Sequence, residues 1–157
     1  MHVEIEHKFL VASDEWREKC VGSVRIVDGL VAITAGRKVR VRIADDEAFI
    51  TLKGARTGLA RDEFEYPIPR EDADNLLASH CDNMILSKTR YFVVEDGFTF
   101  EVDVYDGVLS GVVLAEAELS HPGQEFPRPS WLGEEVTGRP EYKKARMLRV
   151  RLGLQTA

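Results

Sequence analysis

The chain has 157 residues, of which 44% are hydrophobic and 31% charged, and its 21 basic and 27 acidic side chains give a formal net charge of −6. This length suits one hydrophobic core, so we expect residues 1–157 to form a single domain. The negative charge argues against binding to duplex nucleic acid, because neutralising phosphates favours a basic surface. No apolar run approaches the roughly 20 residues that cross a bilayer, so no association with a membrane is expected.

The compartment is predicted from the N-terminus and the cysteines. The sequence enters a strand pattern without a secretion signal or transit segment, which predicts the cytoplasm. Its two cysteines, Cys20 and Cys81, stand alone, so neither a disulfide framework nor a CxxC metal motif is expected.

Alternation of apolar and polar residues predicts eight strands, which cover residues 2–11, 21–34, 38–43, 48–53, 62–68, 84–94, 98–105 and 112–119. We expect an interruption of the second strand at Asp28-Gly29 and a hairpin turn at Asp96-Gly97. Three helices are predicted: a short one capped by Ser13, one that opens at Pro69-Arg70, and one over residues 141–152. Short connections without regular strand–helix alternation favour an antiparallel α+β or barrel-like fold.

Charged residues recur on one face of seven of these strands. Glu4, Glu6 and Lys8 share a face of the first strand, where like charges about 7 Å apart would need a cation or a cluster of bases if that face were buried. The later strands carry, in order, Arg40 and Arg42, Lys53, Glu63 and Glu65, Lys88 and Arg90, Glu101 and Asp103, and Glu116 and Glu118.

This charge pattern has two interpretations. Antiparallel sheets commonly expose one polar face to water, and each strand taken singly fits that description. Within a strand, however, the charges are nearly all of one sign, which favours a ligand shared between strands. Arginine binds phosphate through two parallel hydrogen bonds, and carboxylates suit Mg²⁺ or Mn²⁺. The histidines are isolated and offer no zinc-like spacing; they are His2, His7, His80 and His121.

The opening segment Glu4-Ile5-Glu6-His7-Lys8 has the ExExK signature of CYTH-domain proteins, also called triphosphate tunnel metalloenzymes. The chain resembles the short bacterial members of that family, through the charged pairs above and into residues 131–137. The resemblance implies an α+β fold, in which an eight-stranded antiparallel β-barrel forms a tunnel with a few flanking helices.

By this resemblance the protein is expected to be a divalent-metal-dependent hydrolase of inorganic triphosphate, with Mg²⁺ or Mn²⁺ as the cofactor. The implied metal ligands are Glu4, Glu6, Asp103, Glu116 and Glu118. The implied phosphate contacts are Lys8, Arg40, Arg42, Lys53, Lys88 and Arg90. Catalytic roles are expected for Glu4, Glu6, Lys8 and Lys88, and supporting roles for Glu63, Glu65 and Glu101.

Two positions depart from the family pattern. Leu30 follows Gly29 where short members commonly have tyrosine, so this chain lacks that hydroxyl and its contacts. Lys144 follows Tyr142 and Lys143 where Tyr-x-Asn is usual, and this could alter how the last helix closes one mouth of the tunnel.

Alternatives remain open, since the family also includes adenylyl cyclases and thiamine triphosphatases. No base-binding motif is evident and little chain lies outside the barrel, which favours inorganic triphosphate. A module that binds polyphosphate without cleaving it is a further alternative, although the many carboxylates favour metal chemistry. Apolar residues on outward strand faces make a homodimer a further expectation; they are Ile5, Phe64, Phe100 and Val102.

Overall fold

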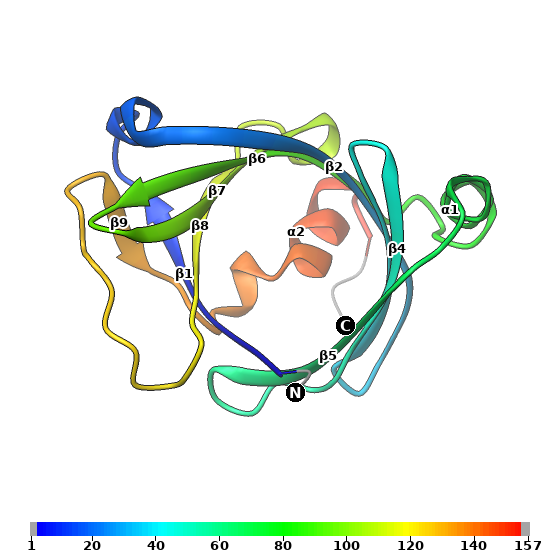
Figure 1. The fold of residues 1–157 in the computed structure, drawn as a ribbon. Coiled ribbons are helices and arrows are strands. Elements are labelled where there is room, and N and C mark those ends of the chain that lie inside the picture. Colours follow the sequence, from blue (N-terminus) through cyan, green and yellow to red (C-terminus); the bar gives the residue numbers. More distant parts are fainter. Residues whose placement is uncertain (1–2, 155–157) are drawn as a thin grey trace.

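Eight antiparallel strands close into a barrel in the computed structural model, which describes residues 3–154 (Figure 1). The barrel strands are β1 (Val3–Val11), β2 (Cys20–Thr34), β3 (Arg37–Ala44), β4 (Glu47–Lys53), β5 (Ala60–Pro67), β6 (Ile85–Glu95), β7 (Phe98–Asp106) and β8 (Val113–Glu118). Their order is β5-β4-β3-β2-β6-β7-β8-β1, and β1 closes the ring by pairing with β5. The predicted antiparallel barrel is therefore confirmed.

Strand β1 closes the barrel by changing partners along its length. Its first residues pair with β5, where Glu4 lies opposite Arg61. Its other edge pairs with β8, where Lys8 lies opposite Glu116. Beyond the contact with β5, a ninth strand, β9 (Leu132–Glu135), continues along β1. The sequence pattern missed β9, because four residues are too few to show a period of two.

The short helices lie on different sides of the barrel. The 3₁₀ helix η1 (Glu15–Lys19) and residues 126–131 cover the outer face of β1, β6, β7 and β8, where an aromatic cluster is buried. Helix α1 (Arg70–Ser79) packs outside β3 and β4 through Ala73. In the view along the barrel, helix α2 (Lys144–Arg151) lies within the ring of strands (Figure 1). Two more 3₁₀ turns are η2 (Gly107–Leu109) and η3 (Pro140–Tyr142).

Several boundary predictions were wrong. Strand β2 runs through Asp28-Gly29 without interruption, because Gly29 provides room for α1 and not for a turn. The N-cap position of η1 is Asp14, whose side chain makes no capping hydrogen bond, whereas Ser13, one residue earlier, accepts a hydrogen bond from the Glu15 backbone N–H through its Oγ at 3.4 Å. The last helix begins at Lys144, after the separate turn η3. Residue 2 of the first predicted strand lies outside the described residues, whereas the Asp96-Gly97 hairpin turn is present with both residues at positive φ.

The apolar outer surface is smaller than the sequence suggested. Ile5, Phe100 and Val102 are buried, and only Phe64 of the four expected residues is exposed. Phe100 packs edge-on against Trp131 at 5.2 Å between ring centroids, which shows how the segment before β9 covers this face. No helix in residues 3–154 is long and apolar enough to span a membrane.

Candidate active site in the barrel interior

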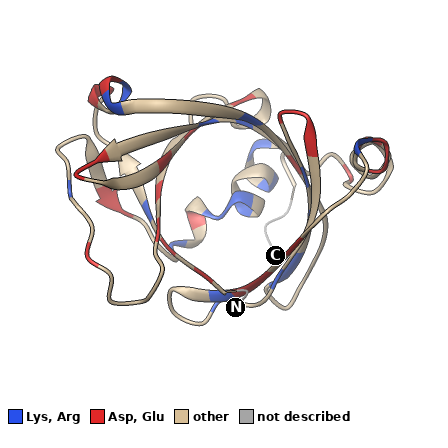
Figure 2. Ribbon diagram, viewed as in Figure 1, with Lys and Arg blue, Asp and Glu red and all other residues tan. Residues whose placement is uncertain are grey.

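Most of the charged residues on the strand faces lie in the barrel interior, whereas Glu65 and Glu118 are exposed. Among the described residues, eight charged side chains are buried: Glu4, Glu6, Asp28, Arg40, Lys88, Arg90, Asp103 and Glu116. Both signs of charge line the ring of strands in Figure 2. Charges can be buried only when they are paired or hydrogen-bonded, so their partners indicate what the interior can bind.

The most buried ion cluster joins β6 to β7. The Lys88 Nζ donates to Asp103 Oδ2 at 2.7 Å, and Arg90 donates to both Asp103 oxygens at 2.8 and 3.0 Å. Burial alone would raise the pKa of Asp103, but Lys88 and Arg90 outweigh that effect and hold it below its usual value. Both Asp103 oxygens are thus occupied by bases. This carboxylate is arranged to position Lys88 and Arg90.

A second set of ion pairs orients the bases of β3. Arg42 donates to both oxygens of Asp28 at 2.7 and 2.9 Å, in a fork geometry. Arg40 donates to Thr51 Oγ1 at 3.1 Å and to Glu65 Oε2 at 3.4 Å. The buried Arg40 Nε has no hydrogen-bond partner, so one donor of this guanidinium remains available to a ligand.

The carboxylates of β1 are balanced by bases from β4 and the following loop. Lys53 Nζ lies 3.0 Å from Glu4 Oε2 and 3.2 Å from Glu63 Oε2. Arg56 lies 3.6 Å from Glu6 and 3.8 Å from Glu4. Burial would raise the pKa of Glu4, but Lys53 lowers it to about 2. Glu4 is therefore a carboxylate at neutral pH, already close to the bases expected to hold phosphate.

The acids Glu4, Glu6 and Glu116 crowd one region of the interior. Burial, and then the charges of Glu116 and Glu4, raise the pKa of Glu6 from 4.5 to about 7. Glu4 Oε1 and Glu116 Oε1 are buried and accept no hydrogen bond, although Arg56 lies 3.8 Å from the first and Lys144 Nζ 3.3 Å from the second. Within residues 3–154, no three potential ligands are already grouped closely enough to hold a metal ion. The mutual repulsion of these carboxylates nevertheless suits a divalent cation, which prefers hard oxygen ligands.

The other predicted acids are distributed differently. Glu101 is 2.7 Å from Arg90, and Glu63 and Glu65 are the ion-pair partners of Lys53 and Arg40. Glu118 lies opposite Glu6 in the ladder of β1 and β8, but it is exposed. It therefore lies at the rim of the acidic group and not at its centre.

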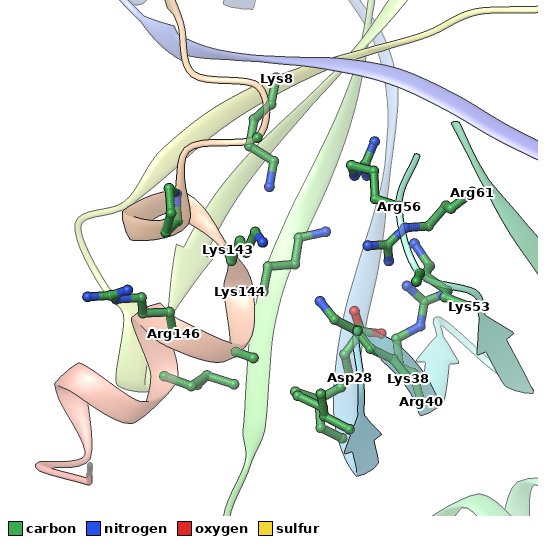
Figure 3. Close-up of a pocket in the computed structure, with 18 of the residues that line it drawn as sticks. Lys8, Asp28, Lys38, Arg40, Lys53, Arg56, Arg61, Lys143, Lys144 and Arg146 are labelled. Atoms are coloured by element: carbon green, nitrogen blue, oxygen red, sulfur yellow. The ribbon is translucent and has the colours of Figure 1, made fainter. Parts of the chain in front are cut away.

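A cavity of about 780 Å³ opens beside this acidic group, and its walls are strongly basic. Of the predicted phosphate contacts, Lys8, Arg40 and Lys53 line it, whereas Arg42, Lys88 and Arg90 do not. Figure 3 shows that bases project into it from the strands and from the C-terminal segment. The lining bases not included in the sequence prediction are Lys38, Arg56, Arg61, Arg139, Lys143, Lys144, Arg146 and Arg149.

The C-terminal segment supplies one wall of the cavity. Lys8 Nζ donates to the Tyr142 carbonyl at 3.2 Å, and its backbone N–H donates to Thr137 Oγ1 at 2.9 Å. Lys144 Nζ lies 3.3 Å from Glu116 Oε1. Burial opposes the charge of Lys144, yet Glu116 raises its pKa above the usual value. The departure at Lys144 therefore places a cation among the acids.

Part of the cavity wall is apolar. Leu30, Met84, Leu86 and Leu148 line the same cavity. Leu30, the other departure from the family pattern, therefore contributes a hydrocarbon side chain where a hydroxyl was expected. Sequence alternation could not reveal this wall, because its members come from two strands, a loop and a helix.

One missed base was visible in the sequence. Lys38 has the same parity as Arg40 and Arg42 on β3, so the period of two places it on the same face. Arg56 lies in a loop, and the bases of residues 139–149 reach the cavity only because α2 packs against η2 and the adjoining ends of β6, β7 and β8. No periodic signal identifies those residues.

Comparisons with known proteins agree with this architecture. Residues 2–151 match the CYTH domain. The chain is 38% identical over 149 residues to an inorganic triphosphatase of Acetivibrio thermocellus, covering 95% of both chains. It is also 38% identical over 144 residues to an inorganic triphosphatase of Nitrosomonas europaea, covering 89% of this chain and 93% of the relative. A crystal structure of an inorganic triphosphatase superposes with a TM-score of 0.65 at 34% identity, covering 92% of this chain and 97% of the other.

Proposed function

Since the chain belongs to the CYTH domain family, we propose that it is a divalent-metal-dependent hydrolase of inorganic triphosphate. The observation that carries the proposal is the arrangement of the barrel interior. A wall of bases faces a cavity large enough for a polyanion, and buried carboxylates crowd beside it. Bases alone would suit binding, whereas the neighbouring acids suit a cation that bridges to phosphate.

The chain offers distinct groups for metal and phosphate. Glu4, Glu6 and Glu116 would hold Mg²⁺ or Mn²⁺, with Glu118 at the rim. When bound, such a cation neutralises charge on phosphate oxygens and lowers the pKa of water. Asp103 positions Lys88 and Arg90 in this account and is not assigned as a ligand, because both its oxygens accept hydrogen bonds from those bases.

The bases that line the cavity would bind and orient the substrate. Lys8, Arg40 and Lys53 have donors within the cavity wall, and the unpartnered Arg40 Nε provides one for a phosphate oxygen. Holding a triphosphate in one orientation and neutralising its charge are the main requirements of phosphoryl transfer. Glu4 remains ionised beside Lys53, so acid and base are preorganised before substrate enters.

An organic triphosphate is a second candidate substrate. The apolar wall of Leu30, Met84, Leu86 and Leu148 could contact a base or a thiazole ring, which inorganic triphosphate lacks. A phosphate-release assay should therefore compare tripolyphosphate, ATP and thiamine triphosphate, with Mg²⁺ or Mn²⁺ and with a chelator. Long-chain polyphosphate serves as a further control.

The assay separates an enzyme from a binding module. We expect tripolyphosphate to have the highest kcat/KM, and the chelator to abolish its turnover. Tight binding of tripolyphosphate by calorimetry without metal-dependent phosphate release would contradict the hydrolase. Preferential cleavage of ATP or thiamine triphosphate would assign the apolar wall to substrate recognition.

A further inference from the structure

Lys38 stands apart from the ion pairs that hold most bases of the barrel. It precedes Arg40 by two residues on β3, and its side chain lines the cavity (Figure 3). In the part of the chain that the structure describes, its ammonium makes no ion pair with a carboxylate. The groups that act on it most are all bases, from three other strands and from α2: Arg61, Lys144, Lys53 and Lys8.

Arg61 of β5 is the base that affects Lys38 most strongly and is in a similar situation. It lines the same cavity, and its Nε is buried without a hydrogen-bond partner. Between residues 3 and 154 it too makes no ion pair with a carboxylate. The buried Arg40 Nε also has no acceptor. Buried donors without acceptors are unfavourable, and oxygens of an anion would satisfy them.

We propose that Lys38 and Arg61 form a phosphate subsite that holds a terminal phosphate of the substrate. This inference rests on the proposed function for the identity of the anion. In a linear triphosphate, each end phosphate carries more negative charge than the middle one. The part of the cavity where bases lack carboxylate partners therefore suits an end phosphate, whereas Lys53 already shares its charge with Glu4 and Glu63.

Binding at this subsite is linked to a proton. Burial, and then the neighbouring cations, lower the pKa of Lys38 from 10.5 to about 7. In the free protein Lys38 is therefore partly neutral at pH 7 to 8, because it is partly buried and faces Arg61, Lys144, Lys53 and Lys8, with Arg40 two residues further along β3. A phosphate dianion beside it favours the ammonium form and raises its pKa. The protein should take up a proton on binding, and affinity should fall as pH rises through 7.

Calorimetric titration of tripolyphosphate into the metal-free protein tests the subsite without turnover. The wild type is compared with Lys38→Met, Lys38→Arg and the control Lys19→Met, an exposed lysine on η1. At pH 6.5 we expect Lys38→Met to bind tripolyphosphate about tenfold more weakly than the wild type, because one charged hydrogen bond is lost. Lys38→Arg and Lys19→Met should bind it with close to the wild-type affinity. Lys38→Met removes one of several mutually repelling cations, so this variant should remain folded.

The pH dependence separates a specific contact from general charge. Titrations at pH 7.5 in two buffers of different ionisation enthalpy measure the number of protons taken up on binding. The wild type should take up more protons than Lys38→Arg, because Lys38 is partly neutral before binding and arginine is always charged. Protons taken up by the ligand itself are the same in both titrations. Any of three results would overturn the subsite. They are equal affinity of the wild type and Lys38→Met at pH 6.5, equal proton uptake by the wild type and Lys38→Arg, and no binding of tripolyphosphate by the wild type. Lys38-dependent binding without phosphate release would instead refute only the hydrolase.

Discussion

Asp103 illustrates at the scale of single residues how the barrel keeps bases in its interior. Its carboxylate is fully buried and accepts hydrogen bonds from Lys88 and Arg90. A buried carboxylate between two buried bases is stable only while all three remain. Asp103 therefore fixes the orientation of Lys88 and Arg90, and the stability of the fold depends on the charges of all three residues.

Replacing Asp103 by Asn should strongly destabilise the protein. The amide cannot neutralise Lys88 and Arg90, and breaking a buried ion pair costs about 3–5 kcal/mol. Urea unfolding followed by circular dichroism measures this change in the free energy of unfolding. The matched control is Asp106→Asn on the same strand, which loses a half-exposed pair with Arg25 and should cost about 1 kcal/mol or less. Equal losses in both variants would contradict the role given to Asp103.

The sequence predicted the interior residues better than their partners. Alternation places Glu4, Glu6, Arg40 and Lys88 on inward faces because the period of a strand is fixed by its geometry. Alternation does not indicate that both oxygens of Asp103 accept hydrogen bonds from Lys88 and Arg90, since ion pairing depends on which strands become neighbours. For the same reason the sequence indicates Asp28, the partner of Arg42, only as part of a strand interruption.

At the scale of elements, β2 shows how one glycine decides a packing contact. A Cβ at Gly29 would lie 2.5 Å from Leu77 Cδ2 and 2.6 Å from Cys81 Sγ. This glycine was read as a break in the strand, but it allows α1 and the following turn to approach a continuous strand. A local sequence signal for a turn was therefore overridden by tertiary contact.

Gly29→Ala should consequently destabilise the protein by about 1–3 kcal/mol, as overpacking does. Gly22→Ala in the same strand is the control, because a Cβ there meets nothing within 4 Å. Thermal unfolding of both variants measures the difference. A Tm of Gly29→Ala equal to that of Gly22→Ala would show that α1 does not press on this position.

Helix α2 connects the fold to the cavity through Leu148. This side chain is fully buried with Leu86, Tyr105 and Leu114, and it also lines the cavity. Leu148→Ala should lower the free energy of unfolding by about 2–5 kcal/mol and raise KM for the triphosphate, since the basic wall would move. Val150→Ala, at a position that is 62% exposed on the same helix, should change stability by at most about 0.5 kcal/mol. An unchanged KM in Leu148→Ala would show that the position of α2 does not affect substrate binding.

At the scale of the whole molecule, closure of the barrel brings seven charged strand faces around one interior. Local alternation predicts each strand but not the pairing of β1 with β5, which links residues 3–5 to residues 60–62. Such pairings depend on long-range geometry, so family resemblance was needed to expect a tunnel. The packing of α2 against η2 and the adjoining strand ends likewise could not be predicted from local periodicity.

The homodimer stays a prediction with a narrower basis. Phe64 remains at the surface, and Leu52 and Tyr66 are exposed on the neighbouring positions of β4 and β5. Sedimentation velocity should show a dimer at micromolar concentration, and Leu52→Glu should shift it toward monomer because the charge disfavours burial. A wild-type protein that remains monomeric over the whole concentration range would refute the dimer.

We propose that the acids of β1 support metal-dependent cleavage of a triphosphate held by the bases around them. Glu6→Gln tests it most directly, with Glu47→Gln as a control at an exposed position on β4. Phosphate release from tripolyphosphate with Mg²⁺ or Mn²⁺ should fall by about 100-fold or more in Glu6→Gln and be unchanged in Glu47→Gln.

The same measurement is paired with the Tm of the metal-free proteins. Removing a charge that Glu4 and Glu116 repel should leave the Tm of Glu6→Gln unchanged or raise it by about 2–4 °C per kcal/mol of relieved repulsion. Loss of turnover in a fully folded Glu6→Gln protein is the predicted result. Metal-dependent phosphate release by Glu6→Gln at close to the wild-type rate would contradict the account.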